Sequence, residues 1–580
     1  MDIVQKDLNK EERHCSQTMK NRRNTQLELN PNNLNSQLTK RIESIKLIYS
    51  QEKAAGNSND DFRSLSKLAK SGRHLRELQI FTAWEVDGNN RSLFHISQAL
   101  KRFDSLQKLN LTFQGCNRIT DKGLEWISQG IKRIFGMKTL VLSFQSDASG
   151  VTDVGVQKIT KIVSQLACLE HLSLEFGYSL QITPTSFKLI GRTLEKLATL
   201  SNLSLQFISC SNINDLALSY LGKSLKSLKC LESLDIGFPY YSKLSESGVI
   251  NFCESLLQSQ ASLKSLSLDF SNFNIISDKI LEQLSEVLKR NGCLQNLSCD
   301  FSYSEGITDE GLYFFHQGLG RLENLQSISF SLSHCKHITD MGITDLNEGL
   351  RNLVHLKSIN LAFHKCPGII NTGLSLLSQS FNGLKHLRNI ALNFSLCSEI
   401  TDTGISSVCQ TLKNSPALLS LTLAFSSCPK ITNSGFEELS QHLKNLNVLK
   451  TMSLDFSQCE TFSDLSVNYF TKSFKSLTSI ESLSLHLSNC LQITNLGLRN
   501  IIEGLRNMIY LKDIWLGFAC CSRVTDAGLL ELGQALRNYP DLKSVVLNFS
   551  GCGNLSKLAV ENIYEELKNI KKVLVVGGRR

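Results

Sequence analysis

Apolar and polar positions along this chain follow a pattern that repeats about every 31 residues. Each unit opens on an apolar residue, and sixteen such openings run from Leu75 to Leu542, with steps of 31 from Leu263 onward. Two copies read LKSINLAFHKCPGIINTGLSLLSQSFNGL, from Leu356, and LLSLTLAFSSCPKITNSGFEELSQHLKNL, from Leu418. A period between about 20 and 50 residues indicates a solenoid or another repeat array.

Within one unit, the pattern changes from that of a strand to that of a helix. Leu109, Leu111 and Phe113 alternate with other residues, which is typical of a short strand with one buried face. Thr120 and Asp121 follow a turn, where threonine is a favoured helix N-cap and aspartate suits the positive end of the helix dipole. Apolar residues then recur at spacings of three and four, which predicts a helix with one buried face.

Stacking identical units places their strands side by side in a parallel sheet. Strands in a sheet lie about 4.8 Å apart, whereas packed helices lie about 8–10 Å apart. The helical side of the stack must therefore be wider, so the stack curves. We expect an α/β solenoid of about 16 strand–turn–helix units, shaped like a horseshoe, with a parallel sheet on its concave face.

Three residue types recur at fixed places in the unit. Phenylalanine ends the strand in 13 of the 15 units after the first, as at Phe113 and Phe394. Cysteine follows three residues later in ten units, as at Cys397. Glycine begins the helix in ten units, as at Gly342, which suggests a close approach of the backbone there. We interpret all three as parts of the architecture, with the cysteines as small buried thiols.

Leu-x-x-Leu-x-Leu followed by Cys-x-x-Ile-Thr-Asp-x-Gly-Leu resembles the leucine-rich-repeat family, over about residues 75–570. The cysteine-containing segment is similar to repeats found in F-box substrate receptors, and the long unit with a full helix is more like the ribonuclease-inhibitor subtype. The unit departs from the cysteine-containing subtype because it is longer, with two extra residues between strand and cysteine. The resemblance implies a fold that hosts many binding roles.

Composition narrows the class of partner and the compartment. A net charge of +9 over 580 residues is too small for the dense basic face of a nucleic-acid-binding protein. No run of 18 apolar residues is present, so we expect no membrane span. The first residues, MDIVQKDLNKEERH, lack the apolar region of a secretory signal. We therefore expect a cytoplasmic or nuclear protein with reduced thiols.

Three parts are expected along the chain. Residues 1–60 are polar and rich in asparagine, so we expect them to be disordered, with a helix over Leu38 to Ser50 as an alternative. Residues 61–570 form the solenoid with an N-terminal cap. Residues 571–580 contain a run from Val573 to Val576, which predicts a capping strand and a tail.

No catalytic motif, phosphate-binding loop or cofactor fingerprint interrupts the repeat, so we expect no enzyme and no cofactor. One set of residues in adjacent turns has the side chains of a zinc site: His334, Cys335, His337, His364 and Cys366. These residues follow the repeat positions and do not form a separate four-ligand motif. We therefore expect no metal site.

The predicted concave face is mostly small and polar, so departures from that pattern mark the candidate binding site. Acidic residues face inward at Glu175, Asp235, Asp269 and Asp300. Tyrosines adjoin them at Tyr178, Tyr240, Tyr241 and Tyr303, and Trp515 forms a second spot near His486. The acidic and aromatic character favours a basic peptide or protein segment, although drift on a solvated face is the competing explanation.

These observations predict a non-enzymatic scaffold that binds a protein or peptide along its concave face. Similarity to the F-box-linked repeats suggests an alternative, the substrate receptor of a cullin-type ubiquitin ligase, although residues 1–73 show no F-box-like pattern. A further alternative is an activator of a small GTPase, similar to the Ran-activating proteins. No arginine or asparagine of this sequence stands out as a catalytic donor for that role.

Overall fold

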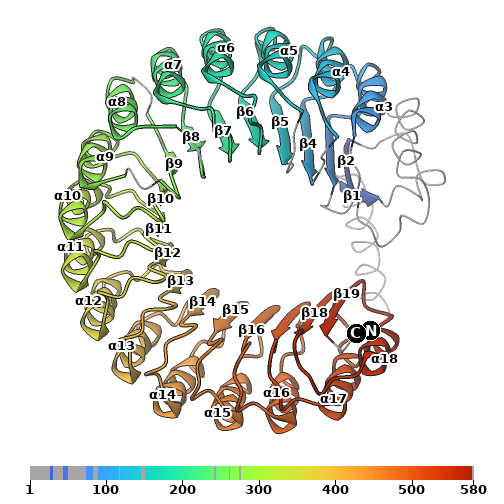
Figure 1. The fold of residues 1–580 in the computed structure, drawn as a ribbon, viewed down its shortest axis with the longest axis vertical. Coiled ribbons are helices and arrows are strands. Elements are labelled where there is room, and N and C mark those ends of the chain that lie inside the picture. The colour runs from blue at the N-terminus through green and yellow to red at the C-terminus, as the bar shows by residue number, and fades with distance from the viewer. Residues whose placement is uncertain are drawn as a thin grey trace, which may run out of the picture. The chain divides into compact units, whose positions relative to one another are not determined.

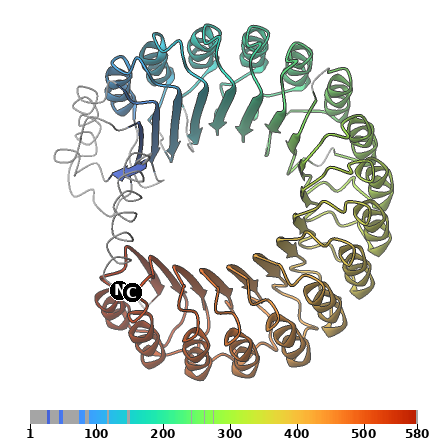
Figure 2. The same ribbon diagram turned by 180° about the vertical axis from the view of Figure 1, so that it is seen from behind.

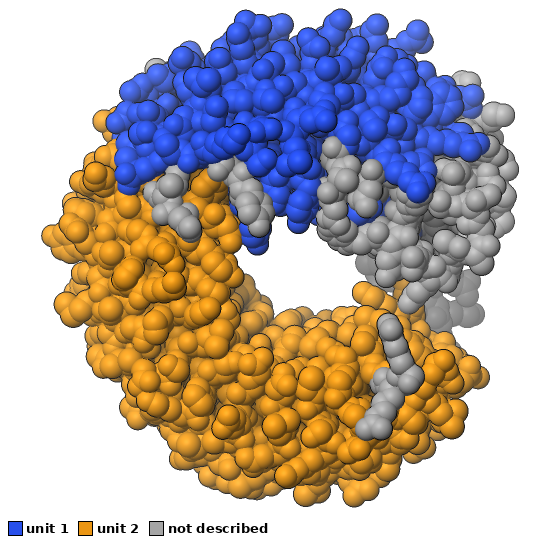
Figure 3. Space-filling view, in the orientation of Figure 1, with its two compact units in different colours: residues 1–262 blue, residues 263–580 orange. Residues whose placement is uncertain are grey.

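A computed structural model of the chain describes residues 26–29, 43–49, 74–82, 89–115, 118–145, 150–240, 243–259, 262–273 and 276–577. The chain divides into two compact units, Met1–Ser262 and Leu263–Arg580, which Figure 3 shows in separate colours. We call them unit 1 and unit 2. Each unit is a run of strand–turn–helix repeats, so the fold is a leucine-rich-repeat solenoid.

Unit 1 contains eight described strands and six described helices. The strands are β1 (Gln26–Leu29), β2 (Ser44–Tyr49), β3 (Glu77–Thr82), β4 (Lys108–Gln114), β5 (Thr139–Gln145), β6 (His171–Gly177), β7 (Asn202–Ile208) and β8 (Ser233–Gly237). The helices are α3 (Asn90–Leu100), α4 (Asp121–Ile131), α5 (Asp153–Val163), α6 (Pro184–Leu194), α7 (Asp215–Leu225) and α8 (Glu246–Leu257). Each strand pairs in parallel with the next, from β1 to β8.

Unit 2 continues the same alternation. Its strands are β9 (Ser265–Asp269), β10 (Asn296–Asp300), β11 (Ser327–Ser331), β12 (Ser358–Ala362), β13 (Asn389–Asn393), β14 (Ser420–Ala424), β15 (Thr451–Asp455), β16 (Ser482–His486), β17 (Asp513–Gly517), β18 (Ser544–Phe549) and β19 (Lys572–Gly577). Its helices are α9 (Asp278–Arg290), α10 (Asp309–Leu319), α11 (Asp340–Leu350), α12 (Asn371–Phe381), α13 (Asp402–Lys413), α14 (Asn433–Leu443), α15 (Asp464–Phe474), α16 (Asn495–Leu505), α17 (Asp526–Leu536) and α18 (Lys557–Glu566).

The predicted curvature is present in each unit. Within each one, the strands lie on the concave side of the arc and the helices on the convex side, as Figures 1 and 2 show from opposite directions. Strand pairing in unit 2 is parallel and in register from β9 to β19. No helix among the described residues has the length and apolar run needed to cross a bilayer.

The core lies between the sheet and the helices, where the repeated residues stack. Phe394 and Phe425 are fully buried, and their rings stack with centroids 6.0 Å apart. The thiol of Cys428 donates to the carbonyl oxygen of Phe394 at 3.4 Å, and Cys459 repeats that contact with Phe425 at 3.3 Å. The interpretation of the cysteines as small buried thiols is therefore confirmed for these units.

The segment that the sequence predicts to be disordered contains two strands, β1 and β2. Strand β2 pairs in parallel with β3, so the helix considered over Leu38 to Ser50 is wrong. Ile45 and Leu47 are buried and alternate with the less buried Ser44, Lys46 and Ile48, which is a strand pattern too short to stand out in the sequence. The rest of residues 1–60, and residues 61–73 of the expected cap, lie outside the described part of the chain.

At its other end, the sheet finishes with β19 beside β18. The hydroxyl of Tyr564, on α18, accepts a hydrogen bond from the Val575 amide at 2.9 Å and donates to its carbonyl at 3.2 Å. This side chain therefore satisfies backbone groups of the last strand that have no further strand to pair with. Unpaired edges invite pairing with other chains, and a side-chain cover of this kind limits that risk.

Candidate functional site

In unit 2, most side chains on the concave face are small and polar, as predicted. Ser267, Ser298 and Ser329 occupy successive strands at the same register. Against this background, the acidic and aromatic candidates are exceptions. They fall in both units, and each group is described within its own unit.

The two acidic candidates of unit 1 lie on strands β6 and β8. Glu175 accepts a short hydrogen bond from the side-chain amide of Gln145 on the neighbouring strand. Asp235 accepts hydrogen bonds from the Ser204 hydroxyl at 2.7 Å and from the Gln206 amide at 2.9 Å. Neutral donors thus hold both carboxylates in place without cancelling their charge.

Tyr178 and Tyr240 follow strands β6 and β8, and their side chains are 40% and 44% exposed. Both residues have positive φ angles, of 53° and 65°. Tyr241, which the sequence places beside Tyr240, lies outside the described residues. Unit 1 therefore presents two acidic groups on alternate strands, β6 and β8, and two exposed tyrosines that follow those strands.

In unit 2, Asp269 and Asp300 lie directly beside each other. They are the last residues of β9 and β10, and the parallel register pairs them. Asp269 accepts a hydrogen bond from the Ser271 amide at 3.0 Å, and Asp300 accepts one from the Ser302 amide at 2.9 Å. Each carboxylate therefore closes a local turn at the end of its strand.

Asparagine closes the same turn in other repeats. The side chain of Asn393 accepts from the Ser395 amide at 3.0 Å, and that of Asn548 accepts from the Ser550 amide at 3.1 Å. The turn therefore requires an oxygen acceptor but no negative charge. The charges of Asp269 and Asp300 exceed what this local structure needs.

The tyrosines Tyr178, Tyr240 and Tyr303 share one repeat position, as the sequence indicates, but its backbone conformation was not predicted. Tyr303 has a φ of 64°, and the equivalent residues of the neighbouring described repeats also have positive φ. Glycine occupies this position at Gly115 and Gly551, and asparagine at Asn272 and Asn489, which are signals in the sequence that could have revealed it. A bulky side chain is disfavoured in this left-handed region, so tyrosine here costs stability compared with glycine.

Tyr303 is 43% exposed and stacks on His334, with ring centroids 3.9 Å apart and an angle of 17° between the rings. His364 lies beside His334, with centroids 5.0 Å apart. Burial lowers the pKa of His334, and the neighbouring charges of His364 and Lys365 lower it further. The imidazole is therefore neutral near pH 7 and forms a flat, uncharged ring platform with Tyr303.

Trp515 lies on β17, separated from Asp300 by strands β11 to β16. It stacks on His486 with ring centroids 3.8 Å apart, so the predicted proximity of these two residues is confirmed. Burial lowers the pKa of His486, although the charge of Asp455, its register partner on β15, acts in the opposite direction. Trp515 thus belongs to a second aromatic spot and is separate from the acidic pair.

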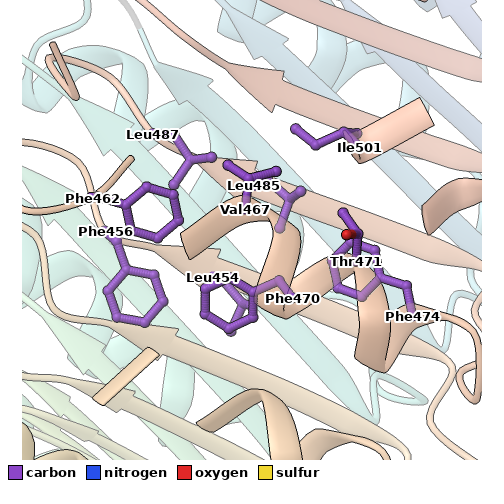
Figure 4. Close-up of a pocket in the computed structure, with 10 residues that line it drawn as sticks. All are labelled: Leu454, Phe456, Phe462, Val467, Phe470, Thr471, Phe474, Leu485, Leu487 and Ile501. Carbon is purple, nitrogen blue, oxygen red and sulfur yellow. The ribbon is translucent and has the colours of Figure 1, made fainter. Parts of the chain in front are cut away.

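A small cavity in the core of unit 2 carries no comparable chemistry. Figure 4 shows its lining, which is apolar except for Thr471. The hydroxyl of Thr471 donates to the carbonyl oxygen of Asn468 within its own helix. A ligand pocket usually offers a few convergent polar groups to orient its ligand, and this cavity lacks them.

The histidine–cysteine set considered for zinc does not converge. Cys335 donates to the Phe301 carbonyl at 3.5 Å, and Cys366 donates to the Leu332 carbonyl at 3.2 Å. Burial raises the pKa of Cys335 to about 12. These thiols are therefore protonated and directed toward backbone oxygens of the core, whereas His334 stacks on Tyr303.

Comparison with known proteins adds little to this description. No protein-family model matches the chain, and no curated protein matches it. Among solved structures, a leucine-rich-repeat protein of Leptospira interrogans resembles it with 14% sequence identity, 94% of each chain covered and a TM-score of 0.29. The assignment of the fold therefore rests on the repeat geometry of the chain itself.

Proposed function

We propose that this chain is a non-enzymatic scaffold that binds a protein or peptide segment on the concave face of its sheet. The observation that carries the proposal is the pair Asp269 and Asp300, side by side at the ends of their strands, with Tyr303 in the turn that follows Asp300. Like charges directly opposite each other on neighbouring strands are destabilising. Features that cost stability without a structural need are characteristic of functional sites.

The chemistry of this surface suits a basic partner. Two adjacent carboxylates attract lysine or arginine side chains through charge-assisted hydrogen bonds. The exposed face of the Tyr303–His334 stack suits a cation above an aromatic ring. We therefore infer that an arginine- or lysine-containing segment lies across the strand ends of β9 and β10.

Two further spots are separate candidates for partner contact. In unit 1, Glu175 and Asp235 accompany Tyr178 and Tyr240 in the same combination of acid and exposed tyrosine. In unit 2, Trp515 and His486 offer a stacked aromatic pair. Aromatic side chains are enriched among the residues that dominate binding energy at protein interfaces, so we propose each spot as a candidate contact within its own unit.

Selection of peptides from a random displayed library by the full chain tests this proposal. We expect enrichment of sequences that contain lysine or arginine, and loss of that enrichment in the double variant Asp269→Asn/Asp300→Asn. Asparagine keeps the acceptor that closes each turn, as Asn393 does, so the variant removes charge and leaves the fold intact. Enrichment of acidic peptides, or equal enrichment by the variant, contradicts the proposal.

The finer family resemblance supports an alternative function. The cysteine-containing repeat signature is similar to that of F-box substrate receptors, in which case the same surface would hold a substrate for a cullin-type ubiquitin ligase. Copurification of a ligase adaptor with the full chain favours this alternative. A Ran-like GTPase activator is the third candidate, and acceleration of GTP hydrolysis by a small GTPase in the presence of the chain is its test.

The proposed function fits a reducing compartment, either the cytoplasm or the nucleus. The described cysteines are free thiols, and those of the ladder donate to backbone carbonyls. Thiols remain reduced in those compartments. Microscopy of the full chain carrying a fluorescent fusion checks this placement, and accumulation in the secretory pathway contradicts it.

A further inference from the structure

Three side chains with metal-binding atoms meet on the helical side of unit 2, away from the sheet face. Cys409 lies on α13, and Glu438 and His442 lie one turn apart on α14. The cysteine sulfur, a carboxylate oxygen and a ring nitrogen all lie within 4.8 Å of one another. Among the described residues, this is the one group of three or more such side chains that gathers so closely.

The repeat itself does not call for these residues. The position of His442 is occupied by Ser380, Thr411 and Ser473 in neighbouring helices. The position of Cys409 is occupied by Ser378 and Ser440. Small hydroxyl residues therefore satisfy the packing at both places, and among the described residues thiol, carboxylate and imidazole come together only between α13 and α14.

Hydrogen bonds outside the cluster orient two of the three groups. His442 Nδ1 lies 3.1 Å from the carbonyl oxygen of Glu438, which fixes the proton on Nδ1 and leaves Nε2 as the nitrogen with a lone pair. The hydroxyl of Ser406 donates to Glu438 Oε1 at 2.7 Å. Histidines and carboxylates that bind metals are held by outer hydrogen bonds of this kind.

We propose that Cys409 Sγ, His442 Nε2 and a carboxylate oxygen of Glu438 form a zinc site that joins two consecutive repeats. Zinc binds thiolate, imidazole and carboxylate with bonds of about 2.0–2.3 Å in tetrahedral geometry, which places ligand atoms about 3.3–3.8 Å apart. One ligand atom of each residue lies within 4.8 Å of the others, so the side chains would have to move closer together when zinc binds. A water molecule completes the fourth position, as in zinc sites with three protein ligands.

Binding exchanges the thiol proton for the metal. Burial raises the pKa of Cys409, and the nearby charge of Glu438 raises it further, so the thiol is protonated in the absence of metal. When zinc binds, the Cys409 S–H bond breaks, a sulfur–zinc bond forms and the proton leaves to solvent. Zinc affinity therefore falls as pH falls.

The position of the proposed zinc site predicts that the metal stabilises the stacking of two repeats. Cys409 belongs to one repeat, and the other two ligands belong to the next, so the metal cross-links α13 to α14. Because zinc binds the folded chain, it raises the apparent stability of unit 2 by mass action. This site is independent of the proposed partner surface, since it lies on the helices and that surface lies on the strands.

Calorimetric titration of the reduced, metal-free full chain with zinc tests the proposal. We expect saturable binding of one zinc ion and an affinity loss of about 100-fold or more in Cys409→Ser and His442→Ser. Serine occupies both positions in neighbouring repeats, so both variants are expected to fold, and thermal unfolding without metal checks this. The matched control is Cys253→Ser, which changes a buried cysteine at the same repeat position of α8.

Cobalt(II) is the second probe, because a thiolate–cobalt bond produces a charge-transfer absorption that other ligands do not. We expect that absorption in the wild-type chain and in Cys253→Ser, and its loss in Cys409→Ser. Zinc binding that is absent, or that persists unchanged in both Cys409→Ser and His442→Ser, overturns the proposal. Loss of the absorption in Cys253→Ser overturns it as well.

Discussion

The carboxylate of Asp309 accepts two hydrogen bonds from Thr339, one from its amide at 2.8 Å and one from its hydroxyl at 2.6 Å. Thr339 is the N-cap of α11, whereas Asp309 begins α10 in the preceding repeat. The same pair of bonds joins Asp464 to Thr494. In these repeats the start of one helix holds the start of the next, which helps to set the spacing of helices along the stack.

Replacing Asp309 with alanine should destabilise unit 2 by about 2–3 kcal/mol, because two hydrogen bonds to a charged group are lost. Asp309→Asn should cost less, since Asn371 keeps both contacts with Thr401 at 3.0 Å. Urea unfolding of the two variants measures the difference. Equal destabilisation by alanine and asparagine would show that the charge, and not the pair of bonds, is what matters.

Gly342 lies where the same contact leaves no room for a side chain. A Cβ atom at this position would lie 2.5 Å from an Asp309 carboxylate oxygen and 2.7 Å from a Leu312 methyl carbon. Gly342→Ala should therefore cost about 1–3 kcal/mol through overpacking. Gly383→Ala is the control, since a Cβ there meets no atom within 4 Å. Similar unfolding midpoints for the two variants would contradict the close approach.

Features that repeat within one unit could be predicted from the sequence. Strand alternation, the helix face and the phenylalanine stack follow from spacing alone, and Ile343, Leu346 and Leu350 are fully buried as that spacing requires. The threonine cap was also predictable, since Thr339 accepts from the Met341 amide at 3.2 Å. These features depend on the sequence of one repeat and on elementary geometry.

Contacts between repeats could not be predicted, because they depend on how far each repeat is shifted relative to its neighbour in the stack. The sequence indicates that Asp309 favours its own helix dipole, but its oxygens bind the next repeat. The turn role of Asp300 and the positive φ of Tyr303 are local to one repeat, and they were missed because the strand pattern gives no sign of the turn that follows it. The sequence identified the residues of the candidate site, but it did not show that some of them also have a structural role in the turn.

Asp455 offers a way to test whether the turn at the end of a strand needs the hydrogen bond of the side chain or its negative charge. Its carboxylate accepts from the Ser457 amide at 2.9 Å, as Asp300 does with Ser302. Asp455→Ala should cost about 1 kcal/mol by leaving that amide without its partner, whereas Asp455→Asn should be close to neutral. Chemical unfolding measures both. A neutral alanine variant would show that the turn does not depend on this bond.

The thiols of the cysteine ladder should resist alkylation in the folded chain. Burial raises the pKa of Cys397 and of Cys459 to about 11. At pH 8 only about one part in a thousand of such a group is thiolate, and the thiolate is the reactive form. Mass spectrometry after brief alkylation should therefore find label on exposed Cys168, Cys230 and Cys293 and none on the ladder.

The same shift predicts how stability depends on pH. A raised pKa in the folded state means that the folded chain holds its thiol protons more tightly than the unfolded chain. The cysteine ladder therefore contributes fully to the free energy of unfolding below about pH 8.5, the pKa of a cysteine thiol in the unfolded chain. That contribution is lost as pH rises toward about 11. Unfolding midpoints should fall over that window, and the fall should be smaller in Cys459→Ser.

The central claim, that the acidic pair of unit 2 holds a partner, is tested most directly by affinity purification with quantitative mass spectrometry. Three forms of the full chain are compared: wild type, Asp269→Asn/Asp300→Asn, and the control Asp455→Asn, which removes a charge at the same repeat position on β15. The account predicts one or more basic partners that the wild type and the control capture equally and that the double variant loses by about tenfold or more, which corresponds to about 1.4 kcal/mol. Equal capture by all three chains contradicts it.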